Sequence, residues 1–466
     1  MILCGAVICG RKRQDQRRTR IVMPNFHSIH MVPVAWRASL KQKVNACACG
    51  AAFALCDPCL AVKPALWVRG KVQAVDDILC CHDICIAYDH HHAKGGDVAQ
   101  KIIIVGGGII GAAAAYHLAR AGAAVTIIDA GHAQATSASF GWVNASYFAD
   151  AAHYRLRVAG MNAYADLAQA LDVPVENRGS IVWEDKGSAF DAQLAKLHDL
   201  GADVQVIDAA QIANLEPALA NPPARAMLFA SEIAVDSALL TRRLIQAAQA
   251  AGVQMITGQG VISVTQTAGR VTGVKTLAGA IAADQVLIAA GTQTGQIADD
   301  CGVPLPMLTR PGLMLRTQPM SKRVISHILA SPDQELRQTS DGAFLAPVGA
   351  GHQAQTADDV TTAPDMLAAQ TVSHLNDMIK DVDLKWSQIT QANRPMPQDG
   401  LPAVGAAGPA GLYLAVMHSG ITLGAVMGNL IAGEMLSGVS NTSGALLGNY
   451  RPTRFGATGP AAPDHI

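Results

Sequence analysis

A glycine-rich turn between two apolar strands constrains the fold of this chain more than any other feature. Residues 101–131 are KIIIVGGGIIGAAAAYHLARAGAAVTIIDAG. The apolar run 102–105 is typical of a strand buried on both faces of a parallel sheet, and the Ala-rich stretch 110–121 predicts a helix. A second strand over 124–128 ends in Asp129. Strand, turn, helix, second strand and terminal acid together predict a dinucleotide-binding βαβ unit.

Each part of this unit has a physical role in holding a pyrophosphate. The first glycine of the motif permits the tight turn, the second lets the backbone approach the phosphates, and the third lets helix and strand pack closely. The helix N-terminus offers free N–H groups, and the acid can accept hydrogen bonds from ribose hydroxyls while disfavouring a 2′-phosphate. The predicted contacts are Gly106, Gly108, Ile109, Ile110, Gly111, Asp129 and Ala130. The motif alone does not choose between NAD and FAD.

The segment after the acid favours a flavin. Residues 135–144 are ATSASFGWVN, so small hydroxyl residues and a glycine follow the second strand without the third βα unit of a simple NAD domain. This arrangement resembles the FAD-dependent D-amino acid oxidase family, which includes glycine oxidase, sarcosine oxidase and D-amino acid dehydrogenase. The resemblance extends over residues 101–455. It implies that this loop wraps the pyrophosphate and passes the flavin ring, with contacts from Thr136, Ser137, Phe140, Gly141 and Trp142.

Later segments follow the same family order. Residues 212–219 resemble a segment of the family's substrate domain, and a helix over 239–251 returns the chain to the cofactor domain. The resemblance implies a backbone contact from Val261 to adenine and a glycine turn at Gly291 that closes over the dinucleotide. Residues 304–317 resemble a family strand pair, in which Arg310 is expected to be structural.

Arg394 is the predicted substrate-binding residue. It lies in NRPMPQDGLPAVG, residues 393–405, and aligns with the family's arginine that holds the substrate carboxylate over the flavin. A guanidinium stays charged and grips a carboxylate with two parallel hydrogen bonds. The competing interpretation is that Arg394 pairs with Asp399 and only shapes the loop.

Residues 411–436 predict a strand, a turn and an apolar helix. The resemblance implies that the N-terminus of this helix points at flavin N1 and C2=O, where N–H groups would stabilise negative charge on the reduced ring. The residues concerned are Ser419, Gly420, Ile421 and Thr422. His418 either faces the substrate or serves as a structural turn donor. Trp142, Tyr147 and Phe148 are further candidates for lining the substrate pocket.

These patterns predict an α/β fold with two interleaved parts. An FAD-binding Rossmann-like domain with a parallel sheet is expected from residues 99–150, 235–300 and 390–455. An α+β substrate domain on a mixed or antiparallel sheet is expected from residues 151–234 and 301–389. Residues 1–98 are expected to be an extension outside the fold.

Composition supports separating that extension from the rest. Nine of the ten cysteines precede residue 98, with 13 basic and 7 acidic residues, against 22 basic and 29 acidic residues after it. The Cys and His residues of 47–59 and 80–92 include thiolates and imidazoles that suit zinc. Their spacing, a C-x-C and one C-x-x-C six residues apart, departs from paired C-x-x-C knuckles. We therefore expect no metal site, and we expect the functional protein to start near Val98.

The predicted function is oxidation of the C–N bond of a small amino acid or secondary amine by hydride transfer to noncovalent FAD. Cys301, the one cysteine after residue 85, does not match the cysteine to which sarcosine oxidases tether their flavin. Oxygen, or a quinone or carrier protein in a dehydrogenase, would take the electrons. A flavin-binding subunit of a larger complex and an NAD-dependent enzyme are two competing interpretations.

Charge and hydropathy bound the partners. The net charge of −1 gives no general attraction to nucleic acid. No apolar stretch of 18 residues is apparent, so no membrane-spanning segment is expected. The protein is expected in the cytoplasm, with peripheral attachment to the inner face of a membrane left open.

Overall fold

The structure is a computed structural model of the 466-residue chain, and it describes residues 99–131, 135–349 and 364–456. All of these belong to the unit Asp89–Ile466. The predicted start of the fold near Val98 and the cysteine-rich segment with its candidate zinc ligands lie outside the described residues.

A six-stranded, mainly parallel sheet carries the glycine-rich turn. Its strand order is β17-β18-β11-β1-β2-β7, and every neighbouring pair is parallel except β17 with β18. The strands are β1 (Lys101–Val105), β2 (Ala124–Asp129), β7 (Gln254–Thr257), β11 (Gln285–Ile288), β17 (Ala403–Ala406) and β18 (Leu412–Val416). The predicted βαβ unit is confirmed, with β1 at the centre of the sheet.

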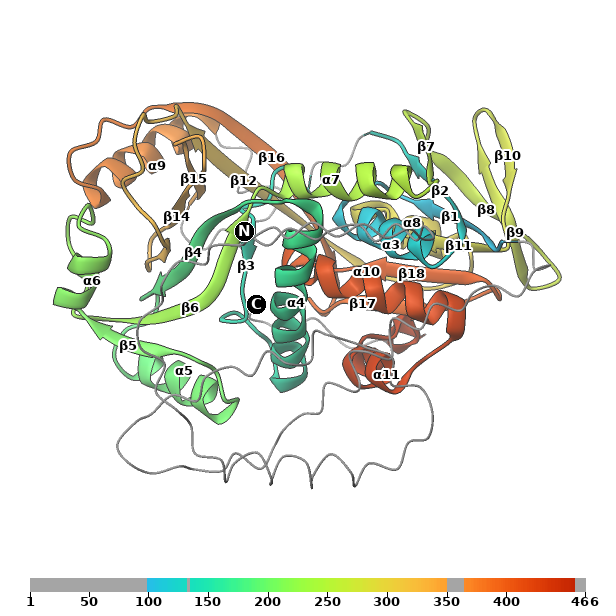
Figure 1. Ribbon diagram of the computed structural model, residues 1–466, viewed down its shortest axis with the longest axis horizontal. Coiled ribbons are helices and arrows are strands. Elements are labelled where there is room, and N and C mark those ends of the chain that lie inside the picture. Colours follow the sequence, from blue (N-terminus) through green and yellow to red (C-terminus); the bar gives the residue numbers. More distant parts are fainter. Residues whose placement is uncertain (1–98, 132–134, 350–363, 457–466) are drawn as a thin grey trace, which may run out of the picture. The chain divides into compact units, whose positions relative to one another are not determined.

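Helices cover one face of this sheet and a small antiparallel sheet covers the other (Figure 1). The helices are α3 (Ile109–Arg120), α4 (Ala151–Leu171), α7 (Ser237–Ala250) and α10 (Gly420–Ser437). The opposite face packs against β8 (Val261–Thr267), β9 (Arg270–Thr276), β10 (Gly279–Ala282) and α8 (Thr294–Asp299). The turn before α8 is the 3-10 helix η3 (Gly291–Gln293). The chain ends in α11 (Asn441–Leu447), η5 (Gly448–Tyr450) and η6 (Pro452–Phe455).

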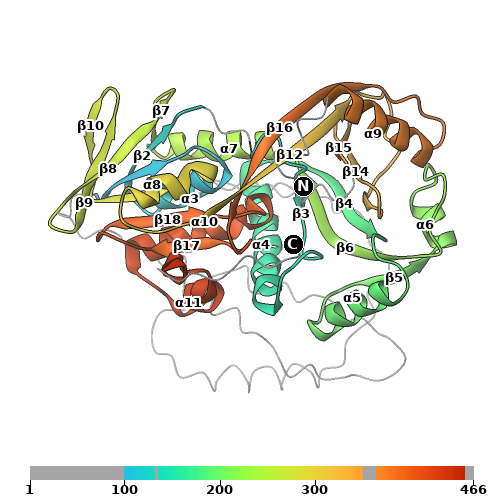
Figure 2. The ribbon, with the colours of Figure 1, turned by 180° about the vertical axis from the view of Figure 1, so that it is seen from behind.

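A nine-stranded mixed sheet forms the second part of the fold. Its order is β16-β12-β15-β14-β13-β4-β6-β3, and β5 pairs with β6. The strands are β3 (Trp142–Val143), β4 (Val175–Val182), β5 (Gln205–Asp208), β6 (Arg225–Val235), β12 (Met307–Thr317), β13 (Ile328–Ala330), β14 (Glu335–Gln338), β15 (Phe344–Pro347) and β16 (Trp386–Pro397). Helices α5 (Ser188–Asp199), α6 (Ala209–Leu215) and α9 (Pro364–Met378) lie along it (Figure 2). The predicted fold class is confirmed.

The chain passes between the two sheets several times. Strand β3 lies in the nine-stranded sheet although it follows closely on the βαβ unit. Strand β6 leads through Asp236, whose side chain caps α7, into the helical layer. Strand β16 spans the predicted boundary at residue 390. The division into domains stays a prediction.

One expected strand pair is wrong. Residues 304–317 contain a single long strand, β12, because the segment pairs along its whole length with β16 and has no partner within itself.

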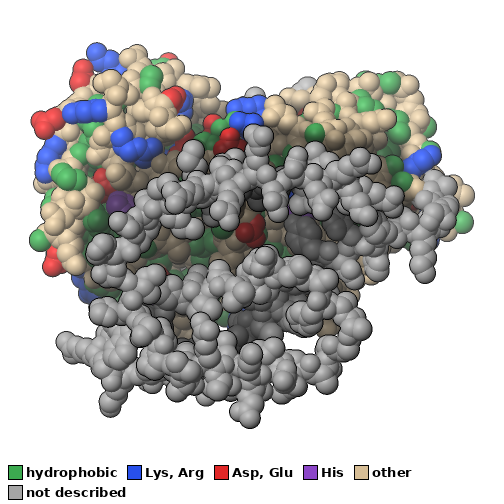
Figure 3. Space-filling model, viewed as in Figure 1, with side chains coloured by type: hydrophobic (Ala, Val, Ile, Leu, Met, Phe, Trp, Pro, Cys, Tyr) green, Lys and Arg blue, Asp and Glu red, His purple; other side chains and the backbone are tan. Residues whose placement is uncertain are grey.

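The surface of the two parts of the fold also differs in its charged side chains. On the face shown in Figure 3, charged side chains are numerous over the part with α5, α6 and α9 and sparse over β7 to β10.

The expectation of no membrane-length apolar stretch is corrected by α10. Among the described residues this one helix is long and apolar enough to cross a bilayer, with a mean hydropathy of 1.2 over 18 residues. Alanine and glycine break the stretch up in the printed sequence, which hides its length. Most of it, 67%, is buried inside the structure, where it packs against α3 and α4. Length and composition alone do not separate a buried core helix from a membrane helix.

Candidate active site

The turn between β1 and α3 leaves no room for side chains. Gly106 has a φ of +107°, and a Cβ there would lie 2.4 Å from the carbonyl oxygen of Ala289. A Cβ at Gly111 would lie 2.0 Å from the carbonyl oxygen of Gly106. Both distances are far inside van der Waals contact, so the predicted roles in the turn and in helix–strand packing fit the geometry.

Two helix N-termini meet beside this turn. Helix α3 starts after Gly108 and α10 after Ser419, and neither has a side-chain cap from its N-cap residue or an acid in its first turn. A Cβ built at Gly420 would lie 3.5 Å from Ile109 Cγ2, so the two first turns are neighbours. The N–H of Ile109 donates to Thr136 Oγ1 at 3.3 Å. The other N–H groups of the two first turns give this place a positive potential suited to an anion.

Asp129 lies at the end of β2, against the same turn. Its carboxylate accepts hydrogen bonds from the backbone N–H of Gly107 and, at 2.6 Å, of Gly131. A Cβ at Gly260 would lie 3.9 Å from Ala130 Cβ, which brings the start of β8 at Val261 beside the predicted ribose end. The predicted adenosine contacts are therefore neighbours in the fold.

The loop after Gly141 is fixed to the start of α10. Gly141 has a φ of +80°, and a Cβ there would lie 2.2 Å from the carbonyl oxygen of Val235. Thr422 Oγ1 donates to the carbonyl oxygen of Trp142 at 3.2 Å. Arg157 Nε donates to the carbonyl oxygen of Asn144 at 3.0 Å, and its Nη1 donates to Ser419 Oγ at 2.7 Å.

Arg157 is not among the residues predicted from the sequence. It is 3% exposed within α4, and burial lowers the pKa of its guanidinium to about 10. The sequence pattern that could have identified Arg157 is its position among the apolar residues on the buried side of α4. His418 lies next to the same group, with Nδ1 3.4 Å from Ser419 Oγ, and Ser419 has a left-handed φ of +53°. This position fits a structural turn donor, while a role toward substrate stays a prediction.

Arg394 lies on the inner face of the nine-stranded sheet. It pairs in register with Arg310 on β12, so its side chain shares a face with Gly312 and Met314. Its guanidinium lies over Gly312, where a Cβ would come within 2.5 Å of Nη2, and its Nη1 donates to the carbonyl oxygen of Pro311 at 2.5 Å. The glycine in mid-strand makes the space for this guanidinium.

The neighbours of Arg394 test one of the two sequence interpretations, the pairing with Asp399. Asp399 forms a two-bond ion pair with Arg454, at 2.7 and 3.0 Å, so the predicted pairing of Arg394 with Asp399 is wrong. A Cβ at Gly291, which has a φ of +59°, would lie 3.9 Å from Pro395 Cβ. The strand that carries the predicted substrate arginine therefore passes the predicted glycine turn over the dinucleotide at the adjacent residue, Pro395.

Aromatic side chains cover the same inner face. The rings of Trp142 and Tyr147 meet edge to face with centroids 5.3 Å apart, and Trp142 meets Phe140 at 6.1 Å. These three residues share a cluster with Met314 and Leu345 of the sheet. Phe148 instead packs with Tyr154 in a different cluster, so it does not line this face.

An acidic group that was not predicted from the sequence lies among these aromatics. Glu232 is 1% exposed and accepts hydrogen bonds from Trp142 Nε1 at 2.9 Å, from Ser180 Oγ at 2.6 Å, and from the backbone N–H groups of Ala145 and Ser146. Burial raises the pKa of Glu232, although hydrogen bonds to the carboxylate oppose the shift. Glu232 therefore holds the indole ring and the loop that follows it in place.

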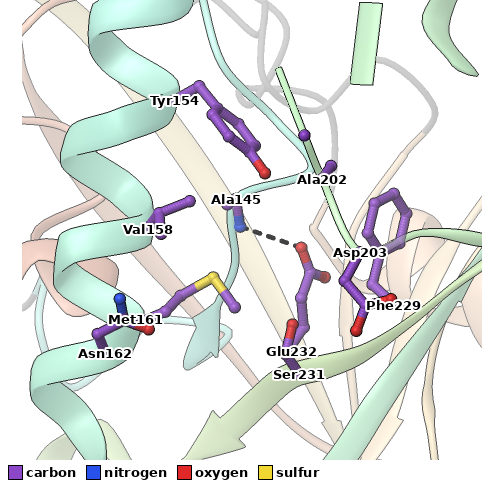
Figure 4. Close-up of a pocket in the computed structure, with 11 residues that line it drawn as sticks. Ala145, Tyr154, Val158, Met161, Asn162, Ala202, Asp203, Phe229, Ser231 and Glu232 are labelled. Atoms are coloured by element: carbon purple, nitrogen blue, oxygen red, sulfur yellow. Dashed lines mark hydrogen bonds between the residues drawn. The ribbon is translucent and has the colours of Figure 1, made fainter. Parts of the chain in front are cut away.

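A cavity of about 270 Å³ lies on the other side of Glu232 (Figure 4). Side chains of α4, among them Tyr154 and Met161, form one wall, and Phe229 and Ser231 of β6 form another. The loop residues Ala202 and Asp203 close it. None of the predicted site residues lines this cavity.

Two other predictions concern metal and thiol chemistry. Within the described ranges, no group of three His, Cys, Asp or Glu side chains could hold a metal ion. Cys301 is a free, buried thiol on the sheet face that packs against β8 and β9, whereas α3 and α10 lie on the opposite face. Ser137 adjoins Thr136 in the loop before Phe140.

Comparisons with known proteins agree with this geometry. A family model described as FAD dependent oxidoreductase, DAO, matches residues 101–434. The D-amino acid dehydrogenase of Rhizorhabdus wittichii is 26% identical over 255 residues, which cover 53% of this chain and 60% of that protein. The match therefore spans less than two thirds of the dehydrogenase.

Solved structures share the fold. Glycine oxidase from Geobacillus kaustophilus superposes with a TM-score of 0.66 at 21% identity, covering 76% of this chain and 99% of that one. Iminodiacetate oxidase from Chelativorans superposes with a TM-score of 0.67 at 24% identity, covering 78% and 100%.

Proposed function

This chain belongs to the DAO family of FAD-dependent oxidoreductases, and from that premise we propose that it oxidises the C–N bond of a small amino acid or carboxylate-bearing secondary amine. The observation that carries the proposal is the position of Arg394. Its guanidinium lies on the inner face of the nine-stranded sheet, and its strand, β16, passes a glycine turn of the cofactor-binding part at the next residue, Pro395. A carboxylate bound there would present its α-carbon toward the cofactor.

The residues present fit FAD. The crowded glycines of the β1–α3 turn leave a cradle that any Cβ would fill, and the two adjacent helix N-termini supply backbone donors. Gly106, Gly108, Ile109 and Thr136 would hold the pyrophosphate, and Asp129 would bind the ribose. The start of α10 at Gly420 would face the flavin ring. When bound, FAD supplies the acceptor for the hydride, and the protein supplies position and electrostatics.

The chain's own residues then perform three tasks. Arg394 binds and orients the carboxylate, which fixes the Cα–H direction. Backbone N–H groups at Gly420 and Ile421 favour negative charge at their helix terminus. Trp142 and Tyr147, held by Glu232 and Glu184, cover the inner face of the sheet and restrict water there. The imine product would hydrolyse in water to a keto acid and an amine.

The test of this proposal is anaerobic reduction of the bound flavin by a panel of amino acids and N-methyl amino acids. We expect at least one member to bleach the flavin absorbance of the wild-type protein. Arg394→Ala should raise KM for that substrate by about 10- to 100-fold, the value of a charge-assisted hydrogen-bond pair, and Arg394→Lys should recover part of the loss. A wild-type protein that no member reduces contradicts the proposal and favours a flavin-binding subunit.

The electron acceptor belongs to the same proposal. Oxygen, or a quinone or carrier protein in the cytoplasm or at the inner face of a membrane, would reoxidise the flavin. The name of the Rhizorhabdus relative, a dehydrogenase, favours the second route. Hydrogen peroxide formed per substrate consumed, compared with the rate of dye reduction, separates the two.

A further inference from the structure

A second charged group shares the inner face with Arg394. Glu335 is 8% exposed and lies on β14, two residues before Arg337, whose partner across the strand is Leu345 of the aromatic cluster. Strand alternation therefore turns Glu335 to the face that carries Met314 and Leu345. The residues between Glu335 and Arg394 in the sheet belong to β15 and β12.

Glu184 reaches the same place from the segment that directly follows β4 (Val175–Val182). Glu335 pairs with Ala330 on β13, and Ala330 pairs with Val182 on β4. Glu184 follows Val182 by two residues, and its Oε2 accepts a hydrogen bond from the Tyr147 hydroxyl at 2.6 Å. Sheet register thus brings Glu184 and Glu335 to the same region of the sheet, and the Tyr147 hydroxyl joins them through its hydrogen bond to Glu184.

The electrostatics connect these groups to Arg394. Burial, together with the negative charge of Glu184, raises the pKa of Glu335 to about 8, and the positive charge of Arg394 opposes the shift. Glu335 in turn opposes the lowering of the Arg394 pKa that burial causes. Burial is the largest cause of the raised pKa of Tyr147, and the charges of Glu335, Glu184 and Glu232 add to it. The neighbouring Arg337 is already held by Glu176 at 2.5 Å.

We propose that Glu335 binds the ammonium group of the substrate and accepts its proton before oxidation. An arginine and a carboxylate on one buried face are complementary to the two charges of an amino acid zwitterion. Arg394 takes the carboxylate and Glu335 takes the ammonium. This inference rests on the proposed function, and it adds a proton acceptor to the residues predicted from the sequence.

The proton step balances within these two groups. One N–H bond of the substrate ammonium breaks, and one O–H bond forms on the Glu335 carboxylate. The substrate nitrogen keeps the electron pair, becomes a neutral amine, and has the lone pair that imine formation requires. An acceptor with a pKa near the working pH serves this purpose best.

The experiment is the pH profile of kcat/KM for wild type and Glu335→Gln, with the substrate found in the flavin panel. In the wild type, the reactive complex needs an ionised Glu335 and an ammonium, so the profile should rise through the pKa of Glu335 and fall above that of the amine. In Glu335→Gln only the neutral amine reacts. We expect at least a 10-fold loss near pH 7, a rise shifted to the pKa of the substrate amine, and no alkaline fall.

Glu184→Gln is the matched variant, because it removes a neighbouring negative charge and keeps Glu335. The pKa of Glu335 should fall, so the rise of the profile should move to lower pH, opposite to the shift in Glu335→Gln. Identical wild-type and Glu335→Gln profiles, or a loss that is the same at every pH, would overturn the inference.

A binding measurement separates this role from a structural one. Propionate has the carboxylate but no amine, so Glu335→Gln should bind it as tightly as wild type or more tightly, as judged by the shift in flavin absorbance. Weaker propionate binding in Glu335→Gln would indicate a collapsed site and contradict the inference. If no amine reduces the wild-type flavin at any pH, the proposed function itself fails. If the wild type is reduced and the two profiles coincide, only the role of Glu335 fails.

Discussion

The cofactor end and the substrate end of the proposed site use different groups to form their binding surfaces. At the cofactor end the surface is formed by backbone atoms and by glycines without side chains, as at Gly106 and Gly111, where the nearest carbonyl oxygen leaves no room for a Cβ. At the substrate end, long charged side chains such as Arg394 and Glu335 project from separate strands onto one face. The first end is fixed by local sequence, and the second by how distant strands align.

The largest expected effect comes from filling the cofactor cradle. In Gly111→Ala the added methyl group would lie 2.0 Å from the Gly106 carbonyl oxygen, so the turn or the helix must move. We expect loss of bound FAD, measured as flavin absorbance per protein, and a stability loss of about 1–3 kcal/mol. Gly433→Ala in α10 is the control, since nothing lies within 4 Å of its Cβ position. Retention of flavin in Gly111→Ala would show that FAD binding does not depend on the close approach of the backbone at Gly111.

A smaller effect should follow from replacing Glu232, which holds the loop of Trp142 at the substrate end. In Glu232→Gln one carboxylate oxygen becomes an NH2 group, which cannot accept a hydrogen bond. At least one of the buried donors that now bind the carboxylate therefore loses its acceptor. The cost should be about 1–3 kcal/mol in urea unfolding. Ser180→Ala, which removes one donor and keeps the carboxylate, should cost less. Equal losses in the two variants would mean that Glu232 does not organise the loop of Trp142.

The most conditional effect concerns stability against pH, because it appears only when the pH is changed. Burial raises the pKa of Glu335 from 4.5 to about 8, so the folded state keeps a proton that the unfolded state has lost. Wild-type stability should therefore fall as the pH rises from about 4.5 to about 8, by up to a few kcal/mol. Glu335→Gln should reduce this fall, which unfolding at pH 5 and pH 9 would measure. Parallel curves for the two proteins would contradict a buried, protonated Glu335.

The same contrast explains what the sequence could predict. The glycine turn, its strands and Asp129 are contiguous in the sequence, and their chemistry requires those residue types, so the βαβ unit was predictable. Glu184 and Glu335 are 151 residues apart, and only the register through β13 brings them together. No sequence pattern predicts how β4, β13 and β14 align with one another. The pairing of Asp399 with Arg454 instead of Arg394 likewise depends on the packing of η6 against β17, which lies outside the local motif.

The central claim is that Arg394 holds a carboxylate beside the flavin, and a binding titration tests it most directly. Propionate is added to the FAD-loaded protein, and the change in flavin absorbance gives Kd for wild type, Arg394→Ala and Asp399→Asn. We predict saturable binding in wild type and Asp399→Asn, and a Kd about 10- to 100-fold higher in Arg394→Ala. An unchanged Kd in Arg394→Ala would contradict the claim.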